Sequence, residues 1–296
     1  EVRIKVDDSI NGNNVAENTG VITYSDSVIL ESAKGSINGI TLVNSETNSF
    51  DVILRAAEDI SIAKANSLNI ESIYTEKGAV VLNGGSDVKI NGAVVGGDAS
   101  INSAGKIVAD TIRGGTIALE AKEEIQLTTI EADGEISILS GKDVIISTKD
   151  EVNSLKAEEE LTDNKADYTN VFIVGKVNIN DSNFADDTGK AVLRSSNGDI
   201  HIEAGGKVAI DKLEASGAKI SVEADRLGID NVSNLGETAN EISIKGVDGE
   251  SASYVGVGSS DGKELLIANS KVENVIITAI DNAGLQNVAL KEKAIG

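Results

Sequence analysis

Apolar and polar residues alternate in short segments along most of the chain, and each segment ends at a turn rich in Gly, Asn or Asp. Three such segments are Thr116-Ile-Ala-Leu-Glu120, Glu135-Ile-Ser-Ile-Leu139 and Lys219-Ile-Ser-Val-Glu-Ala224. Alternation with a period of two is typical of a strand that buries one face. The pattern therefore predicts an all-β chain built from short strands.

The segments recur about every 20 residues. Those that start at Ala79 and Ala99 are 20 positions apart, and those that start at Asp199 and Lys219 are again 20 positions apart. One or two further short segments, such as Asp143-Val-Ile-Ile146, lie between successive starts. One unit of this size cannot bury its own apolar face, so the repeat indicates a solenoid in which neighbouring units stack.

The fold class that we predict is an all-β parallel β-helix with coils of about 20 residues. An antiparallel sandwich is the alternative, because it also has short strands, but it does not require equivalent positions to recur at a fixed spacing. The chain contains no Pro. Because Pro cannot donate to a strand ladder, this absence fits a backbone that is paired on both sides.

The repeat predicts three regions. Residues 1–148 are expected to form coils, with an irregular start over 1–32, and residues 190–296 to form coils with a less regular tail. Residues 149–189 interrupt the pattern. They include Leu155-Lys-Ala-Glu-Glu-Glu-Leu161, which prefers a helix by propensity. We expect this interruption to be an irregular insertion, protruding as a loop or short helix, or a junction between two runs of coils.

The composition excludes several kinds of site. The 296 residues contain no Cys and a single His, so disulfides, Cys-based metal sites and thiol nucleophiles are excluded. The net charge of −22 disfavours nucleic acid and anionic membranes as partners. No apolar run approaches the ~20 residues needed to span a bilayer, so we expect no membrane insertion by this segment. Since the chain begins at Glu1 and lacks Met, we expect a processed chain or an excerpt.

His201 is the first candidate for chemistry. It lies between Ile200 and Ile202, so strand alternation points the two Ile side chains inward and His201 outward, on the same face as Glu203. A general base or a metal ligand needs further partners in space. We interpret His201 as a solvated strand residue and assign no catalytic and no cofactor-binding residues.

Clusters of acidic and Asn residues make Ca²⁺ the metal ion to consider as a ligand. Asp181, Asp186 and Asp187 lie close to three Asn residues and could supply oxygen ligands. The segment lacks the Gly and Glu positions of an EF-hand loop. Gly84-Gly-Ser-Asp87 comes closest to a calcium-binding β-roll repeat but departs from it. We therefore assign no metal ligand and no cofactor, and keep Ca²⁺ as an open possibility.

Paired glycines occur at 84–85, 96–97, 114–115 and 205–206. A phosphate-binding loop needs a helix after it, whereas each of these pairs is followed by another strand pattern. We interpret them as turn glycines that supply positive φ angles.

An enzyme acting on glycans is the catalytic alternative for a β-helix. Such a site needs acid, base and aromatic side chains in one place. The chain has only 3 Phe, 4 Tyr and no Trp, and its Arg residues are scattered. We therefore predict that the protein is not an enzyme.

Segments such as Gly134-Glu-Ile-Ser-Ile-Leu-Ser-Gly-Lys-Asp-Val-Ile-Ile146 and Gly198-Asp-Ile-His-Ile-Glu-Ala-Gly-Gly-Lys-Val-Ala-Ile210 resemble coils of filamentous-haemagglutinin-like exoproteins. These are large bacterial surface adhesins exported by two-partner secretion. The resemblance covers most of 33–148 and 190–248, and it implies a right-handed parallel β-helix used as an extended surface stalk. The secretion domain of that family carries an Asn-Pro-Asn-type motif, and a chain without Pro is not that domain.

The function that we expect is a non-catalytic structural or adhesive stalk module of a secreted or surface-attached bacterial protein. Its partners would be a receptor or glycan on a host or neighbouring cell, or copies of itself, and its location extracellular. Surface-layer proteins share the acidic, Cys-free, β-rich composition. A subunit of a self-assembling surface layer or filament, dependent on Ca²⁺ or not, is therefore the first alternative, and the glycan-cleaving β-helix enzyme is the second.

Overall fold

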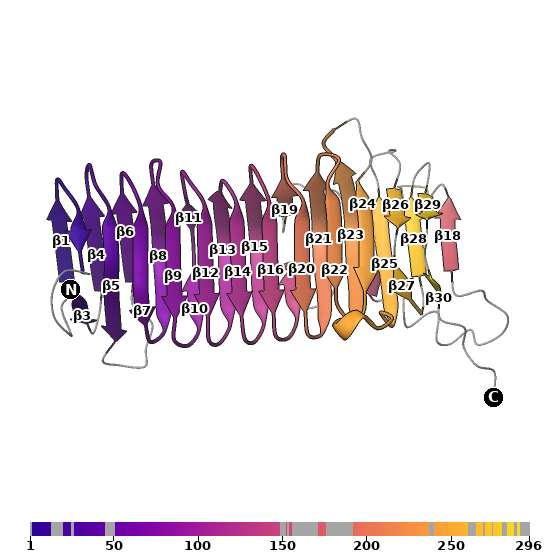
Figure 1. Ribbon diagram of the computed structural model, residues 1–296, viewed down its shortest axis with the longest axis horizontal. Coiled ribbons are helices and arrows are strands. Elements are labelled where there is room, and N and C mark those ends of the chain that lie inside the picture. The colour runs from indigo at the N-terminus through magenta and orange to yellow at the C-terminus, as the bar shows by residue number, and fades with distance from the viewer. Residues whose placement is uncertain are drawn as a thin grey trace. The chain divides into compact units, whose positions relative to one another are not determined.

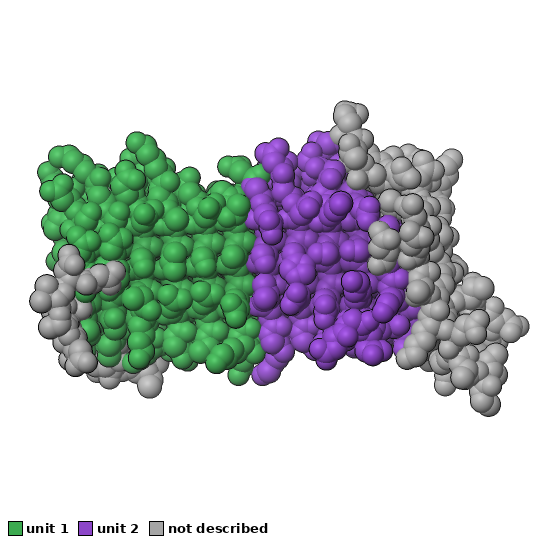
Figure 2. Space-filling model, in the orientation of Figure 1, with its two compact units in different colours: residues 1–133 green, residues 134–296 purple. Residues whose placement is uncertain are grey.

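The computed structural model of the chain describes residues 2–12, 20–24, 27–44, 51–148, 152, 154–155, 171–175, 192–236, 240–259, 265–268, 270–273, 275–279, 283–286 and 289–290. The chain forms two compact units, residues 1–133 and residues 134–296 (Figure 2). Each unit is a parallel β-solenoid, as the repeat predicts.

The strands of the first unit are β1 (Val2–Val6), β2 (Ile10–Asn11), β3 (Val21–Tyr24), β4 (Ser27–Ser32), β5 (Ile37–Asn44), β6 (Asp51–Ala56), β7 (Ile60–Ala65), β8 (Leu68–Thr75), β9 (Val80–Gly84), β10 (Val88–Ile90), β11 (Ala93–Val94), β12 (Ala99–Ser103), β13 (Ile107–Gly114), β14 (Ile117–Ala121) and β15 (Ile125–Ala132). Its described strands stack in two parallel series, β1-β4-β6-β8-β10-β13-β15 and β2-β5-β7-β9-β12-β14 (Figure 1).

The second unit contains β16 (Ile136–Ser140), β17 (Val144–Ile146), β18 (Val171–Gly175), β19 (Val192–Ser195), β20 (Ile200–Ala204), β21 (Lys207–Ala215), β22 (Lys219–Glu223), β23 (Arg226–Asn234), β24 (Glu241–Lys245), the 3₁₀ turn η2 (Val247–Gly249), β25 (Tyr254–Ser259), β26 (Leu265–Ala268), β27 (Lys271–Val272), β28 (Val275–Ala279), β29 (Ala283–Gln286) and β30 (Ala289–Leu290). Its two main series are β17-β21-β23-β25-β28-β18 and β16-β20-β22-β24-β26-β29, again parallel.

Equivalent residues of successive coils lie beside one another. Leu82 pairs in register with Ile101, and Ile101 with Leu119, so that the three side chains form one inward column. All three are at most 1% exposed. Because each coil covers the apolar face of its neighbour, the small Ile, Val, Leu and Ala side chains build a core without large aromatic residues.

The long strands of one series turn a corner. In β8 the inward positions of the first half end at Ile70, two outward residues follow (Glu71 and Ser72), and the inward positions resume at Ile73. In the next coil the same corner lies at Asn91-Gly92, the two residues between the end of β10 and the start of β11. The third short segment of each repeat is thus the second half of a bent strand.

Strand β18 lies out of sequence order. It belongs to the region 149–189 and pairs in parallel with β28, Val171 opposite Val275, beyond the last in-order strand of its series. A segment from the middle of the chain therefore occupies the edge on which a further coil would stack. The division of the chain at 148/149 and 189/190 that the repeat predicts stays a prediction.

Candidate interaction surface

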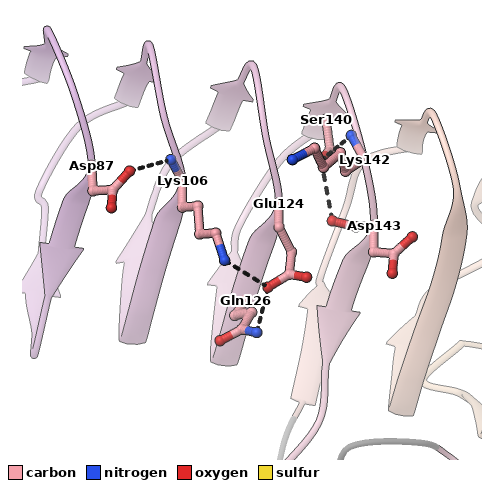
Figure 3. Close-up of polar contacts among 7 residues, drawn as sticks. All are labelled: Asp87, Lys106, Glu124, Gln126, Ser140, Lys142 and Asp143. Carbon is pink, nitrogen blue, oxygen red and sulfur yellow. Dashed lines mark hydrogen bonds and ion pairs between the residues drawn. The ribbon is translucent and has the colours of Figure 1, made fainter.

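Aspartate side chains tie successive coils together on the outer surface. Each of these Asp residues directly precedes a strand, and its carboxylate accepts a hydrogen bond from a backbone N–H in the next described coil. We call these contacts the Asp clamps, and Figure 3 shows that of Asp87. The five clamps are Asp59 to Ala79 (2.8 Å), Asp87 to Lys106 (2.9 Å), Asp98 to Thr116 (2.8 Å), Asp143 to Lys207 (2.9 Å) and Asp199 to Lys219 (2.8 Å).

The clamp of Asp98 affects its protonation. Hydrogen bonds from the backbone and then the side chain of Thr116 hold the pKa of the Asp98 carboxyl below its ordinary value, against a smaller opposing effect of burial. The charged form is favoured because it accepts these bonds. Part of the acidic charge of the chain therefore has a structural role.

The expectation that the turn glycines supply positive φ is wrong for most of them. Among the described glycines, only Gly20, Gly39, Gly217 and Gly249 have positive φ. Most of the others are needed for close approach, whereas a Cβ on Gly92 would meet nothing within 4 Å. A Cβ on Gly115 would lie 2.8 Å from Oδ1 of Asp98, and a Cβ on Gly206 would overlap Oδ1 of Asp143. In the clamps of Asp87, Asp98 and Asp143, glycine precedes the bonded residue because the carboxylate of the previous coil fills the space of a side chain.

His201 points outward, as predicted, and contacts two polar side chains. Its Nε2 lies 2.8 Å from Oε1 of Glu203, and its Nδ1 lies 2.8 Å from Oγ of Ser221 in the next coil. A hydroxyl, an imidazole and a carboxylate in this order are the parts of a hydrolytic triad. A triad also needs donors for an oxyanion. Here β20 and β22 are each paired on both sides, so their N–H groups are used in the sheet ladder.

The outer face of the first unit carries one row of residues in register. We call it the outer row: Lys5, Glu31, Arg55, Tyr74, Val94, Arg113 and Glu131. At its centre Tyr74 is 48% exposed and Val94 45% exposed, which makes them the two most exposed large apolar residues described in this unit. Tyr and Arg are enriched at interfaces. The outer row is therefore the candidate interaction surface.

The charged ends of the outer row are held by ion pairs. Arg55 lies 3.4 Å from Glu31, and Arg113 Nε donates to Glu131. Both Glu residues stand on the side away from the apolar centre, because they occupy the next register position outward. The Arg side chains remain 54% and 55% exposed. Each guanidinium is thus fixed in place and still has donors for a ligand.

A second outer feature belongs to the second unit. Ala209, Gly228 and Gly256 are register partners on three adjacent strands, at positions that point away from the core. We call them the outer trough. Val152 and Leu155, at 0% and 1% exposure, fill it. A Cβ on Gly228 would overlap Leu155, so glycine is required there for close packing.

Polar bonds fix the same segment to the trough. Ser154 N–H donates to Oδ1 of Asp230 (2.7 Å), and the buried Tyr254 hydroxyl donates to the Ser154 carbonyl (2.8 Å). Ser147 Oγ donates to Oδ1 of Asp211 (2.7 Å). The segment was expected either to protrude or to form a junction. Among its described residues, Val152 and Leu155 pack on the outer trough and β18 pairs with β28. Residues 156–161 lie outside the described residues, and the expectation for the whole segment stays a prediction.

Glu214 is the most buried acid that has a described ion pair. Burial raises its pKa, but the bonds from Lys212 (2.9 Å) and Arg194 (2.6 Å) outweigh this effect and leave the pKa lowered. The three residues lie on β19 and β21, and the Glu214 carboxylate is shared by the two cations. We interpret them as a structural ion-pair network.

The other predicted site residues give no site. Asp181, Asp186 and Asp187 lie outside the described residues. In the part of the chain that the structure describes, no group of three or more His, Asp or Glu side chains is placed to hold a metal ion. Within the same part, no helix is long and apolar enough to cross a membrane.

Two features were missed by reasoning from single segments. Ser221 is one coil away from His201, and Tyr74 is one coil away from Arg55 and from Val94. Aligning the repeats at a spacing of 20 would have placed each of these residues beside its partners. Small residues at outward strand positions in successive coils, such as Gly228 and Gly256, would have indicated that something covers that face.

No family model matches this chain, and no curated protein and no solved structure matches it. What is established is therefore the fold, a parallel β-solenoid, and the arrangement of its outer faces.

Proposed function

We propose that the chain is a non-catalytic stalk and adhesion module of a secreted or surface-attached bacterial protein. The observation that carries the proposal is the outer row, in which a solvent-exposed Tyr74 and Val94 stand between two anchored Arg residues on a rigid sheet. The Asp clamps support the stalk role, because they join coil to coil along the outer surface.

A glycan that bears carboxylates is the partner that fits the outer row. An exposed tyrosine ring can stack on the apolar face of a sugar. Arg55 and Arg113 can each donate two parallel hydrogen bonds to a carboxylate. Neighbouring strands are about 4.8 Å apart, so the two Arg residues, three strands from each other, suit a ligand roughly 14 Å long.

The experiment compares two variants in binding to immobilised polyuronate and to sialylated cell-surface glycans. We expect Tyr74→Ser combined with Val94→Ser to abolish binding. Val81→Ser is the matched control, because Val81 is 37% exposed and lies on the other sheet of the same unit. Equal binding by both variants, or no binding by the unaltered chain, would contradict the proposed surface.

The absence of catalysis is tested separately. We expect no cleavage of polyuronates, host glycans or simple esters, by the unaltered chain or by His201→Ala. Turnover by the unaltered chain that is lost in His201→Ala or Ser221→Ala would overturn the proposal that the protein is non-catalytic. Ordered arrays that form when Ca²⁺ is added would instead favour the surface-layer alternative.

A further inference from the structure

The chain contains five Asn-Gly pairs, which begin at Asn11, Asn38, Asn83, Asn91 and Asn197. Asn-Gly is the dipeptide most prone to deamidation, because the nitrogen of a glycine can approach the preceding side chain without hindrance from a Cβ. The reaction has two structural requirements. The side-chain amide of the Asn has to be able to rotate toward the next backbone nitrogen, and that nitrogen has to be free of a hydrogen bond.

Hydrogen bonds restrain the Asn side chain in three of the pairs. Asn38 Nδ2 donates to Oδ1 of Asn11 (3.1 Å), and the N–H of Gly12 donates to the Asn38 carbonyl (2.7 Å). Asn102 Nδ2 donates to Oδ1 of Asn83 (3.2 Å). These residues form short ladders between coils, so their side chains cannot turn toward the following nitrogen without loss of a bond.

A fourth pair is restrained at the glycine. Asn197 is exposed, but the N–H of Gly198 donates to Oγ of Ser195 (3.1 Å). The same hydroxyl donates to the Gly198 carbonyl (2.9 Å). The attacking nitrogen is therefore occupied in a closed turn.

Asn91-Gly92 differs from the other four. It forms the corner between β10 and β11, and the Asn91 side chain is exposed and bonds to no described residue. The N–H of Gly92 likewise makes no hydrogen bond with the described part of the chain, and a Cβ built on Gly92 would meet nothing within 4 Å. The Asn91 side chain and the Gly92 nitrogen thus meet both structural requirements of the reaction.

We propose that Asn91 is a site of spontaneous covalent modification, at which the exposed Asn91-Gly92 corner converts to isoaspartate. The Gly92 nitrogen loses its proton and attacks Cγ of Asn91, the C–N bond of the side-chain amide breaks, and ammonia leaves. Water then opens the resulting succinimide at either carbonyl and gives isoaspartate or aspartate. No oxidant or reductant takes part, and the product is the substrate class of protein isoaspartyl methyltransferases.

The modification acts on two hydrogen bonds that hold the corner to β8. Asn91 N–H donates to the Ile70 carbonyl, and Ile73 N–H donates to the Gly92 carbonyl, both at 2.9 Å. Isoaspartate adds one carbon atom to the backbone between these two bonds and one negative charge. The spacing no longer matches that of the adjacent coil, so the Ile73 amide should exchange with solvent faster.

The test is peptide mapping by mass spectrometry of the folded chain after incubation at mildly alkaline pH and 37 °C, with isoaspartate detected by enzymatic methylation. The other four Asn-Gly pairs are internal controls. One restraining hydrogen bond is worth about 1 kcal/mol, so we expect Asn91 to react at least about fivefold faster than each of them. In the chain unfolded by urea, the deamidation rates of the five Asn-Gly pairs should become similar.

Two outcomes would overturn the proposal. One is equal reaction of the five pairs in the folded chain, and the other is earlier reaction at Asn197 or Asn83. Asn91→Gln should abolish methylation at position 91 and leave Ile73 exchange unchanged over time. Freshly prepared Asn91→Asp adds the charge before its own Asp-Gly pair isomerises to isoaspartate, and faster Ile73 exchange in this fresh variant would assign the effect to charge instead.

Discussion

The carboxylate of Asp98 accepts a 2.8 Å hydrogen bond from the backbone N–H of Thr116, one coil further along the chain. The bond joins two turns at equivalent places in the repeat, and each of these turns contains a pair of glycines, at 96–97 and at 114–115. It recurs at four other described Asp residues, and in four of the five cases a glycine directly precedes the donor. The Asp clamp and the glycine that accommodates it are thus one structural unit.

Removal of a clamp should weaken the solenoid by a small, pH-dependent amount. We expect Asp98→Ala to lower the free energy of unfolding by about 0.5 kcal/mol, at the low end for a hydrogen bond because the carboxylate is exposed. The folded-state pKa of Asp98 is lowered. This stabilisation is therefore complete above the unfolded-state pKa and is lost as the pH falls through the folded-state value.

Urea unfolding at neutral and acidic pH measures this effect. The difference between Asp98→Ala and the unaltered chain should shrink as the pH drops into the range where Asp98 is protonated. Asp110→Ala is the control, since Asp110 is an exposed acid of β13 whose carboxylate makes no hydrogen bond or ion pair with the described residues. A difference that is independent of pH would contradict the clamp.

A double-mutant cycle tests whether glycine is needed because of the clamp. We expect Gly206→Ala to destabilise by about 1 kcal/mol, because its Cβ would displace the Asp143 carboxylate that accepts from Lys207. In the Asp143→Ala background the same change should cost much less, with a coupling of at least about 0.5 kcal/mol. Strictly additive effects in thermal or urea unfolding would show that glycine is required for another reason.

Leu155 should hold its segment on the outer trough. It is 1% exposed and contacts the position of Gly228, so we expect Leu155→Ala to destabilise by about 2 kcal/mol. Cleavage of the chain near residue 155 by a protease should become faster. Leu235→Ala removes a leucine that is 47% exposed, and its effect should stay within about 0.5 kcal/mol. Similar effects of the two changes would disprove the anchoring role.

The strand register is tested by a charge placed in an inward column. Ile138 is 0% exposed and pairs in register with Ile202. Ile138→Asp should destabilise by several kcal/mol, because it buries a charge without a partner. Ser137→Asp, on the outward side of the same strand, should change the stability by less than about 0.5 kcal/mol. If Ile138→Asp also changes it by less than that, the register of β16 is wrong.

Much of the fold could be predicted from the sequence because it depends on local rules. Alternation of period two placed Ile200 and Ile202 inside and His201 outside, and the spacing of 20 placed equivalent strands in adjacent coils. The bend of β8 at Glu71-Ser72 could also be found, since two successive polar residues shift the alternation. These signals are local because a solenoid coil contacts mainly its two neighbours.

The sequence predicted that the glycines lie in turns, but it did not show why glycine is required there. A glycine pair predicts a turn, but the reason for glycine at 115 and at 206 is the carboxylate of an Asp in the previous coil. That reason involves two residues from different coils, and a backbone preference cannot supply it. The pairing of His201 with Ser221 also involves two coils, and only an alignment of the repeats would have indicated it.

The sequence by itself determined the strand period, the coil length and the inward or outward direction of most side chains, because these depend on alternation and repeat spacing. Only the tertiary structure decided which outward residues meet: the outer row around Tyr74, the Asp clamps, and the return of Leu155 and β18 to the solenoid. The physical reason is that register between coils and the path of an inserted segment are set by packing over long sequence distances. The repeat spacing indicates neighbours such as Arg55 and Tyr74, but it encodes neither the exact register between coils nor the path of an inserted segment.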